Sequence, residues 1–444
     1  MYGKKVTSLL KSINADVMDR VRLSYGKVSL EGEVMPSTEA NDPDVLIVKL
    51  DSGYNIGIDP GRYKAEKLAS KPREIELPAA KLVRNKGLDD VSLIYTGGTI
   101  GSRVDYKTGA VHMLTKPEEL LYEVPEISDI ANVSIIPLLS IMSEDMSYVE
   151  WSKMAEAAAK ELNGGARGVV FTHGTDIMHY SSAALSFMLR GLNAPVVFTG
   201  SQRSPDRGSS DAFMNLVCSL DVAAKSDIAE VGICMHHTSS DTACAFMRGT
   251  KVRKMHTSRR DTFRPINDKP IALIEHTGAI RYTSAYAKID REGGERIKPL
   301  TGYDRKVALV KVFPGSDPSI IDFYREKGYN GLILEGTGLG HMPVTPTRKE
   351  DSWLPLVRDA VENGMVVGMA SQCLYGRVNA NVYRNLRLIS GAGAIYCEDM
   401  TPETALVKLG WLLGNYGKDE ARRMLNRNMV GEIKSRTGFD TFLV

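Results

Sequence analysis

Cysteine is scarce in this 444-residue chain. Its five cysteines, at positions 218, 234, 244, 373 and 397, form no CxxC pair, which excludes a disulfide framework and a zinc knuckle. Long apolar runs are missing as well, since no segment approaches the ~18 apolar residues of a membrane span. Charged residues interrupt the N-terminal stretch, so no secretory signal is expected. These absences predict a cytoplasmic protein.

Net charge is also scarce. The 56 Lys and Arg residues nearly balance the 54 Asp and Glu residues, for a net charge of +2. A chain whose whole surface binds nucleic acid needs a basic excess, so that class is excluded, while a local basic patch stays open. With 43% apolar and 25% charged residues, and the length of about three ~150-residue domains, the chain is expected to be a multidomain globular protein.

Residues 1–75 are predicted to form a small SH3/Sm-like β-barrel domain. Three strand-forming stretches, RVRLSYGKV, SLEGEVMP and DVLIVKLDSGYNIGI, follow one another there, with a turn at 51–53. A slight basic excess leaves a role in RNA or partner binding open beside a plain solvated surface. The polar, proline-containing stretch that follows predicts a linker over 76–90.

Beyond the linker, short apolar runs alternate with helical stretches. Continuous apolar strands with helical crossovers are typical of a parallel sheet covered on both faces, so the fold class is α/β. The polar stretch 279–306 predicts an interdomain linker between two such lobes, 91–278 and 307–444. The expected strands are 91–95, 168–171, 195–199, 231–235, 271–275, 307–313, 331–335 and 365–370.

Ligands in an open parallel sheet bind beyond the carboxyl ends of the strands. The segments that follow five of the expected strands are 96–101 (TGGTIG), 172–176 (THGTD), 200–203 (GSQR), 336–341 (GTGLGH) and 371–373 (SQC). Most are rich in glycine and small hydroxyl residues, which let a backbone approach a small ligand closely and present hydroxyl and N–H groups to it.

Phosphate binding does not fit these loops. TGGTIG lacks the lysine of a P-loop, and GTGLGH has His341 where a dinucleotide fingerprint needs its third glycine. Neither a GxSxG elbow nor an HExxH motif occurs. The remaining hydroxyls and one acid indicate nucleophilic acyl transfer, in which a neighbouring base activates a threonine or serine.

Residues 248–264 are rich in Lys and Arg and hold a single acid, Asp261. A lysine among like charges gives up its proton more readily and can serve as the base. A solvated basic face or an RNA-contact strip explains the same composition, so composition alone leaves all three interpretations open.

TGGTIG and HGTD, in that order and ~75 residues apart, resemble the signatures of the bacterial-type L-asparaginase and glutaminase amidohydrolases. The resemblance covers roughly 91–444. It implies a larger N-terminal and a smaller C-terminal α/β lobe and a threonine nucleophile. It also implies a second threonine that forms a triad with an aspartate and a lysine, and no metal or cofactor in this chain.

Carried over residue by residue, the resemblance implies that Thr99 is the nucleophile and that Thr175, Asp176 and Lys254 form the triad. Asp176 would also bind the α-amino group of the substrate. The alternatives are a turn threonine at Thr99 and a helix cap at Asp176.

The same resemblance implies several substrate contacts. Tyr106 matches a loop tyrosine that closes over the substrate, unless it is simply a surface aromatic residue. Ser143 matches the residue that contacts the α-carboxylate, and the loops of Gly98 and Gly174 would supply backbone N–H groups. Glu144 stands where the family usually has glutamine, a departure that bears on recognition of free asparagine.

The extra N-terminal domain is a second departure. Together with LILEGTGLGHMP, SQCLYGRVNANVY and EDMTPETALVKLGWLLG, it looks most like one branch of the family, the ammonia-producing subunits of archaeal glutamyl-tRNA(Gln) amidotransferases. This implies glutamine or asparagine as amide donor, a homodimer through the amidohydrolase lobes within an α2β2 assembly, and a partner subunit that binds Glu-tRNA(Gln), ATP and Mg²⁺. A free-standing L-asparaginase and a catalytically inactive RNA-binding protein are the alternatives.

Overall fold

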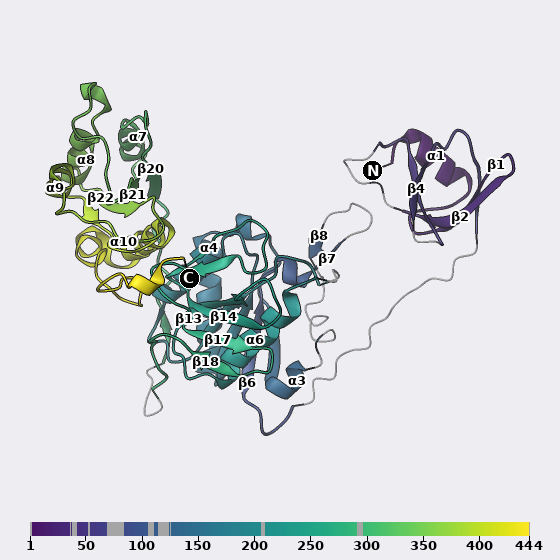
Figure 1. Cartoon of the computed structure of the whole chain (residues 1–444), viewed down its shortest axis with the longest axis horizontal. Helices are drawn as coiled ribbons and strands as arrows, with labels where there is room; N and C mark the ends of the chain where they lie inside the picture. Colours follow the sequence, from purple (N-terminus) through teal and green to yellow (C-terminus); the bar gives the residue numbers. More distant parts are fainter. Residues whose placement is uncertain are drawn as a thin grey trace. The chain divides into compact units, whose positions relative to one another are not determined.

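The computed structural model forms two compact units (Figure 1). The first unit is Met1–Ala80 with Ser102–Glu119, and the second is Lys81–Gly101 with Leu120–Val444. The structure describes residues 2–35, 37, 42–51, 54–68, 84–104, 111–113, 124, 126–205, 209–290 and 296–443.

The first unit is an antiparallel sheet with a helix packed on it. Alternate residues of β1, among them Val21 and Leu23, point inward, and α1 adds Val6 and Leu10 to the same small core. The expected strands are present, whereas α1 is an element that the strand pattern did not predict. Residues 52 and 53 of the expected turn lie outside the described residues. The elements are α1 Lys4–Ser12, β1 Arg20–Tyr25, β2 Val28–Val34, β3 Leu46–Leu50, β4 Asn55–Ile58 and β5 Lys64–Lys67, in the sheet order β4-β3-β2-β1-β5, and the hairpin β7 Ser102–Val104 and β8 Val111–Met113.

An eight-stranded sheet forms the N-terminal lobe of the second unit, in the order β18-β17-β14-β13-β12-β10-β6-β9. The strands from β9 to β13 run parallel, while β14, β17 and β18 extend the sheet antiparallel because no helix crosses between them. The strands are β6 Asp90–Tyr95, β9 Asn132–Pro137, β10 Gly168–Thr172, β12 Val196–Thr199, β13 Val231–His236, β14 Ala243–Arg248, β17 Ala272–Glu275 and β18 Ile280–Tyr282.

Both faces of this sheet are covered. Along β10, Val169 and Phe171 pack into one hydrophobic core, whereas Val170 packs into the other, as the two-residue period of a strand requires. Helices α4 and α5 belong to the first core, and α3 and α6 belong to the second. The helices are α3 Ile127–Ile130, α4 Tyr148–Asn163, α5 Met178–Met188 and α6 Ala212–Lys225, with the 3₁₀ turns η1 Thr99–Gly101 and η2 Ser143–Asp145.

The C-terminal lobe is a parallel sheet in the order β20-β21-β22-β23. Helices α7, α8 and α9 cover one face, and α10 packs on the other face and on α5, where the rings of Phe187 and Trp411 stack at 5.7 Å. One core therefore runs through both lobes. The elements are β20 Val307–Lys311, α7 Ile320–Glu326, β21 Gly331–Gly336, η3 Lys349–Asp351, α8 Trp353–Glu362, β22 Val366–Ser371, α9 Arg384–Gly391, β23 Ile395–Tyr396, α10 Pro402–Met424 and η4 Phe439–Thr441.

Two short ribbons complete the second unit. β11 (Leu189–Arg190) pairs with β19 (Lys298–Pro299), and β15 (Val252–Lys254) pairs with β16 (Phe263–Pro265). The stretch 279–306, expected as a linker, thus contributes β18 and β19 to the folded lobe. None of the helices in the described part of the chain has both the length and the apolar character that crossing a bilayer requires.

Candidate active site

Three neighbouring parallel strands of the N-terminal lobe end at one edge of the sheet. Tyr95 at the end of β6 pairs in register with Thr172 at the end of β10, and Thr172 pairs with Thr199 at the end of β12. The loops 96–101, 172–176 and 200–203 therefore leave the sheet side by side, at the edge where open α/β sheets bind ligands.

The first two loops are in backbone contact. The Thr96 hydroxyl donates to the carbonyl of Thr172 at 2.6 Å. Gly98 has φ +89°, and a Cβ built on it would lie 2.5 Å from the backbone nitrogen of Gly174. Only glycine satisfies both the left-handed backbone and this close approach. Thr99, the next residue, begins η1 and is half-buried at the same edge.

Ser143 reaches the site from η2. A Cβ on Gly174 would lie 2.7 Å from the Ser143 Cβ and 2.8 Å from its Oγ, so this glycine makes room for the serine. Ser143 is buried, and its hydroxyl lies 3.5 Å from a carboxylate oxygen of Glu144. The structure therefore brings Gly98, Gly174 and Ser143 together beside Thr99.

Lys254 forms a hydrogen-bonded trio with Thr175 and Asp176 of the second loop. Its Nζ donates to the Thr175 hydroxyl at 2.9 Å and to Asp176 Oδ1 at 2.7 Å. The lysine side chain is 11% exposed, whereas that of Asp176 is 67% exposed. An ammonium held by a hydroxyl and a carboxylate, with the carboxylate open to solvent, can move protons at a bound ligand.

Asp176 does not cap the helix that follows it. Helix α5 begins at Met178, its N-cap is Ile177, and no side chain caps it. The Asp176 carboxylate instead accepts the hydrogen bond from Lys254. Its position is thus explained by the lysine.

Two buried histidines flank the trio, and sequence reasoning gave neither a role. Complete burial lowers the pKa of His173 to about 4, and its Nδ1 lies 2.6 Å from the carbonyl of Gly174. Burial, assisted by the cations of Arg253 and Lys254, lowers the pKa of His179 to about 3. Both imidazoles are therefore neutral at pH 7. Burial sets the protonation state of these two histidines, and the sequence motif does not show which residues are buried.

Asp211 and Asn215 support the third loop and were also missed. Buried Asp211 accepts hydrogen bonds from the backbone N–H groups of Gln202 and Arg203, at 3.0 and 3.1 Å. The Asn215 amide donates to the carbonyl of Gly200 at 2.9 Å. An acid and an amide four residues apart at the start of a helix are only a weak signal, because many helices begin that way.

Most basic side chains of the stretch 248–264 form ion pairs with acidic side chains of the same fold. Arg248 bonds Glu230 and Asp268, Lys251 bonds Asp399, and both Arg259 and Arg264 bond Asp261. Such pairing counts against a solvated basic face or an RNA-contact strip. Tyr106 lies outside the described residues.

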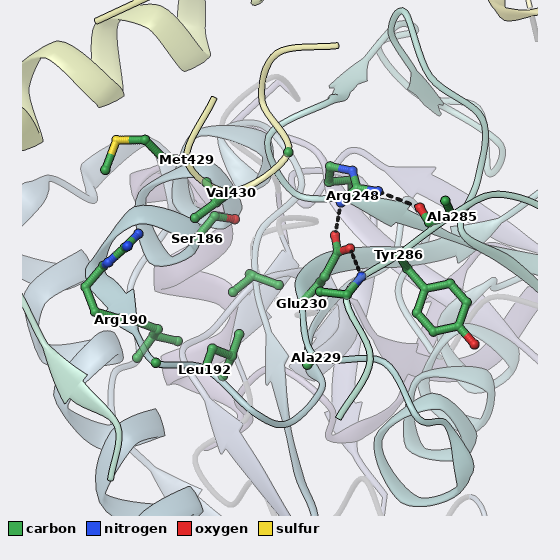
Figure 2. Close-up of a pocket in the computed structure, with 15 residues that line it drawn as sticks. Ser186, Arg190, Leu192, Ala229, Glu230, Arg248, Ala285, Tyr286, Met429 and Val430 are labelled. Carbon is green, nitrogen blue, oxygen red and sulfur yellow. Dashed lines mark hydrogen bonds and ion pairs between the residues drawn. The ribbon is translucent and has the colours of Figure 1, made fainter. Parts of the chain in front are cut away.

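A cavity of about 510 Å³ lies elsewhere in this unit (Figure 2). Arg248 joins Glu230 and the Ala285 carbonyl there, and the backbone N–H of Ala287 donates to Glu230 at 2.7 Å. None of Thr99, Thr175, Asp176 and Lys254 lines it. Among the described residues, no group of three or more His, Cys, Asp or Glu side chains is placed to hold a metal ion.

Comparison with known families accounts for most of the chain. The profile described as asparaginase, N-terminal, matches residues 90–287, and that of the glutaminase/asparaginase C-terminal domain matches 306–425. The profile of the GatD N-terminal domain matches 15–68.

Several relatives that match along their whole length are D subunits of one enzyme. The D subunit of glutamyl-tRNA(Gln) amidotransferase from Thermococcus kodakarensis is 48% identical over 99% of this chain and 99% of its own length. The D subunit from Pyrococcus abyssi is 48% identical over 99% of this chain and 100% of its own, and that from Methanothermobacter thermautotrophicus is 45% identical over 99% of each chain.

Solved structures show the same fold over the two lobes. The thermostable L-asparaginase from Thermococcus kodakarensis has a TM-score of 0.68 at 28% identity, over 78% of this chain and 99% of that one. L-asparaginase I from Vibrio cholerae has a TM-score of 0.67 at 29% identity, with the same coverage.

Proposed function

This chain belongs to the glutaminase/asparaginase family and, within it, to the glutamyl-tRNA(Gln) amidotransferase D subunits, and on that premise we propose that it releases ammonia from glutamine or asparagine through a threonine acyl-enzyme and passes the ammonia to a partner subunit. The observation that carries the proposal is the contact of Lys254 with Thr175 and Asp176. This contact lies at the edge of the sheet from which the Thr99 loop leaves. Hydroxyl, lysine and carboxylate are the groups that threonine-dependent amide cleavage needs.

In the proposed reaction the Thr99 hydroxyl oxygen attacks the side-chain amide carbon. The proton it loses passes through Thr175 and Lys254 to the amide nitrogen, which leaves as ammonia. Backbone N–H groups of the Gly98 and Gly174 loops stabilise the oxyanion. Water then hydrolyses the ester on Thr99, which restores the hydroxyl and releases the acid.

The substrate contacts follow from the exposure of the trio. Asp176 is the solvent-facing carboxylate and would bind the α-amino group, while its bond to Lys254 orients it. Ser143, packed against Gly174, would contact the α-carboxylate. Glu144 places a second carboxylate beside that serine, and like charges so close together disfavour each other.

The partner is proposed to be the E subunit of the same amidotransferase. It would bind Glu-tRNA(Gln), ATP and Mg²⁺ and convert Glu-tRNA(Gln) to Gln-tRNA(Gln), while this chain carries no cofactor. The relatives are named as subunits of that enzyme, which supports this division of labour. A homodimer through the amidohydrolase lobes, in an α2β2 assembly in the cytoplasm, completes the proposal.

The test measures ammonia release from glutamine and from asparagine by the full chain alone, with the E subunit, and with the E subunit and Glu-tRNA(Gln). Stimulation by partner and tRNA supports the amidotransferase. Strong release by the chain alone, unchanged by either addition, supports a free-standing asparaginase. No release in any arm supports an RNA-binding protein.

A diazoketone analogue of glutamine tests the nucleophile separately. It should alkylate the Thr99 oxygen, and peptide mass spectrometry should place the adduct on the peptide that contains Thr99. An adduct on Thr175 or Ser143 instead would contradict the assignment.

A further inference from the structure

Lys254 lies on a short element outside the main sheet. β15 has three residues, which pair in register with the three residues of β16, and Lys254 lies opposite Phe263. A two-stranded ribbon of this size is marginal by itself. Contacts beyond this ribbon therefore contribute to holding the lysine in register with Thr175.

The C-terminal lobe supplies that support. The hydroxyl of Thr404 donates to the Thr250 carbonyl at 3.1 Å, and the Lys251 Nζ lies 2.6 Å from Asp399 Oδ2. Asp399 lies just before α10, and Thr404 lies in the first turn of that helix. The backbone just before β15 is therefore anchored by residues about 150 positions away in the sequence.

The residue adjacent to the lysine makes the third contact. Arg253 lies 2.7 Å from Glu403 Oε1, and the Glu403 side chain is 7% exposed. Successive residues of a strand point to opposite sides, so Arg253 reaches the C-terminal lobe while Lys254 reaches Thr175. An anchor on one fixes the backbone that carries the other.

Glu403 itself is held firmly. It is the second residue of α10, behind the N-cap Thr401, whose hydroxyl accepts the Thr404 N–H at 3.2 Å. A helix N-terminus stabilises a carboxylate. The other carboxylate oxygen of Glu403, Oε2, is buried and accepts no hydrogen bond from the described residues. Among those residues, Arg253 is the ion-pair partner of this carboxylate.

From these contacts we infer that the Arg253–Glu403 pair positions Lys254 for proton transfer, and that the C-terminal lobe thereby sets the activity of a site built in the N-terminal lobe. This inference rests on the proposed function, because it assigns a task to Lys254. Glu403 and Arg253 are positioning residues that touch neither substrate nor reacting atoms.

The experiment uses the full chain under the condition in which the wild type releases ammonia. Arg253→Met should lower kcat by about 10- to 100-fold with KM changed less than about threefold, since a misplacement of about 1 Å costs rate more than binding. Glu403→Gln should lower kcat by a smaller factor, and Arg253→Lys should restore part of the loss. In the double variant the two losses should not multiply.

The matched control is Glu432→Gln, which breaks the Lys408–Glu432 ion pair. Both side chains of that pair are fully buried, and Lys408 lies on the same helix α10. This variant should lower Tm while kcat stays within about twofold. The pH–rate profile should shift in Arg253→Met and Glu403→Gln, which a general loss of stability would not produce.

Two results would overturn the inference: a kcat near wild type in Arg253→Met, or an equal loss of kcat in Glu432→Gln. Lys254→Met separates this inference from the proposed function. If that variant is inactive while Arg253→Met is normal, only the positioning role is lost. If Lys254→Met is fully active, the proton-transfer role proposed for Lys254 is lost as well, while ammonia release itself stands.

Discussion

The two lobes of the second unit end in similar loops that are used differently. At both carboxyl edges, parallel strands lead into glycine-rich and hydroxyl-rich segments. In the C-terminal lobe these groups bond to their own backbone: the Ser371 hydroxyl donates to Gly338 at 2.6 Å, and the Gln372 amide donates to Glu335 at 2.8 Å. In the N-terminal lobe, Thr175 instead meets the ammonium of Lys254.

The difference shows that a glycine-hydroxyl loop is not a site by itself. Such loops close tightly wherever a strand ends, and their polar groups are readily satisfied within the loop. At the N-terminal edge, a lysine from a separate ribbon and an exposed carboxylate are added. A charged pair beside a hydroxyl separates this candidate site from its neighbour.

The largest effect is expected at the proposed nucleophile. Thr99→Ala should lower ammonia release by more than about 10³-fold, because no other group would form the ester. The matched change at the other edge, Ser371→Ala, should leave the rate within about threefold. Equal effects of the two changes on kcat would remove the functional contrast between the edges.

Lys254→Met should rank second. Loss of a positioned proton-transfer group typically costs about 10²- to 10⁴-fold in rate, and the assay is again kcat for ammonia release. Lys269→Met is the control, since Lys269 pairs with the exposed Asp440 and surface pairs contribute little to stability. Retention of more than a tenth of wild-type kcat in Lys254→Met would contradict the proton-transfer role.

Gly98→Ala should reduce stability as well as activity. The left-handed φ of +89° and the overlap with the Gly174 nitrogen together predict a loss of about 4 kcal/mol in the free energy of unfolding. Gly338→Ala, at φ +51° with nothing within 4 Å of the added Cβ, should cost only about 1 kcal/mol. Denaturant titration measures both, and similar losses would mean that the contact between the 96–101 and 172–176 loops does not constrain the first edge.

Stability should also depend on pH through the histidine beneath the first edge. The pKa of His173 is lowered from 6.5 to about 4 in the fold, so the unfolded chain binds its proton first as the pH falls. This pKa difference corresponds to about 3 kcal/mol in the free energy of unfolding. That stability is complete above pH 6.5 and is lost as the pH falls from 6.5 to 4. Below pH 4 it changes no further.

The measurement is the free energy of unfolding at several pH values. His173→Asn, which keeps a donor near the position of Nδ1, should lose about 3 kcal/mol less than the wild type over that window. A slope as steep as the wild type's would show that His173 is not the group responsible.

Much of the fold was legible in the sequence. The strands expected at 91–95, 168–171 and 331–335 are observed within a residue or so, as β6, β10 and β21, because a strand buried on both faces is a continuous apolar run. β9 was missed because it is an edge strand with a mixed burial pattern. β14 was missed altogether, and with it the antiparallel pairing at that side of the sheet, because strand direction depends on the route of the chain rather than on composition.

Sequence by itself determined which residue types stand at the ends of the strands, since TGGTIG and HGTD place hydroxyls, glycines and an acid where a parallel sheet presents them. Composition left open which lysine joins them, and although the family resemblance implied Lys254, the contact itself is made only by the tertiary structure. The basic stretch contains both Lys251 and Lys254. Lys251 is fully buried against Asp399, and Lys254 lies 2.9 Å from the Thr175 hydroxyl. The choice follows from the path of β15 and from packing across the two lobes, contacts that span 79 to 148 positions and leave no trace in local composition.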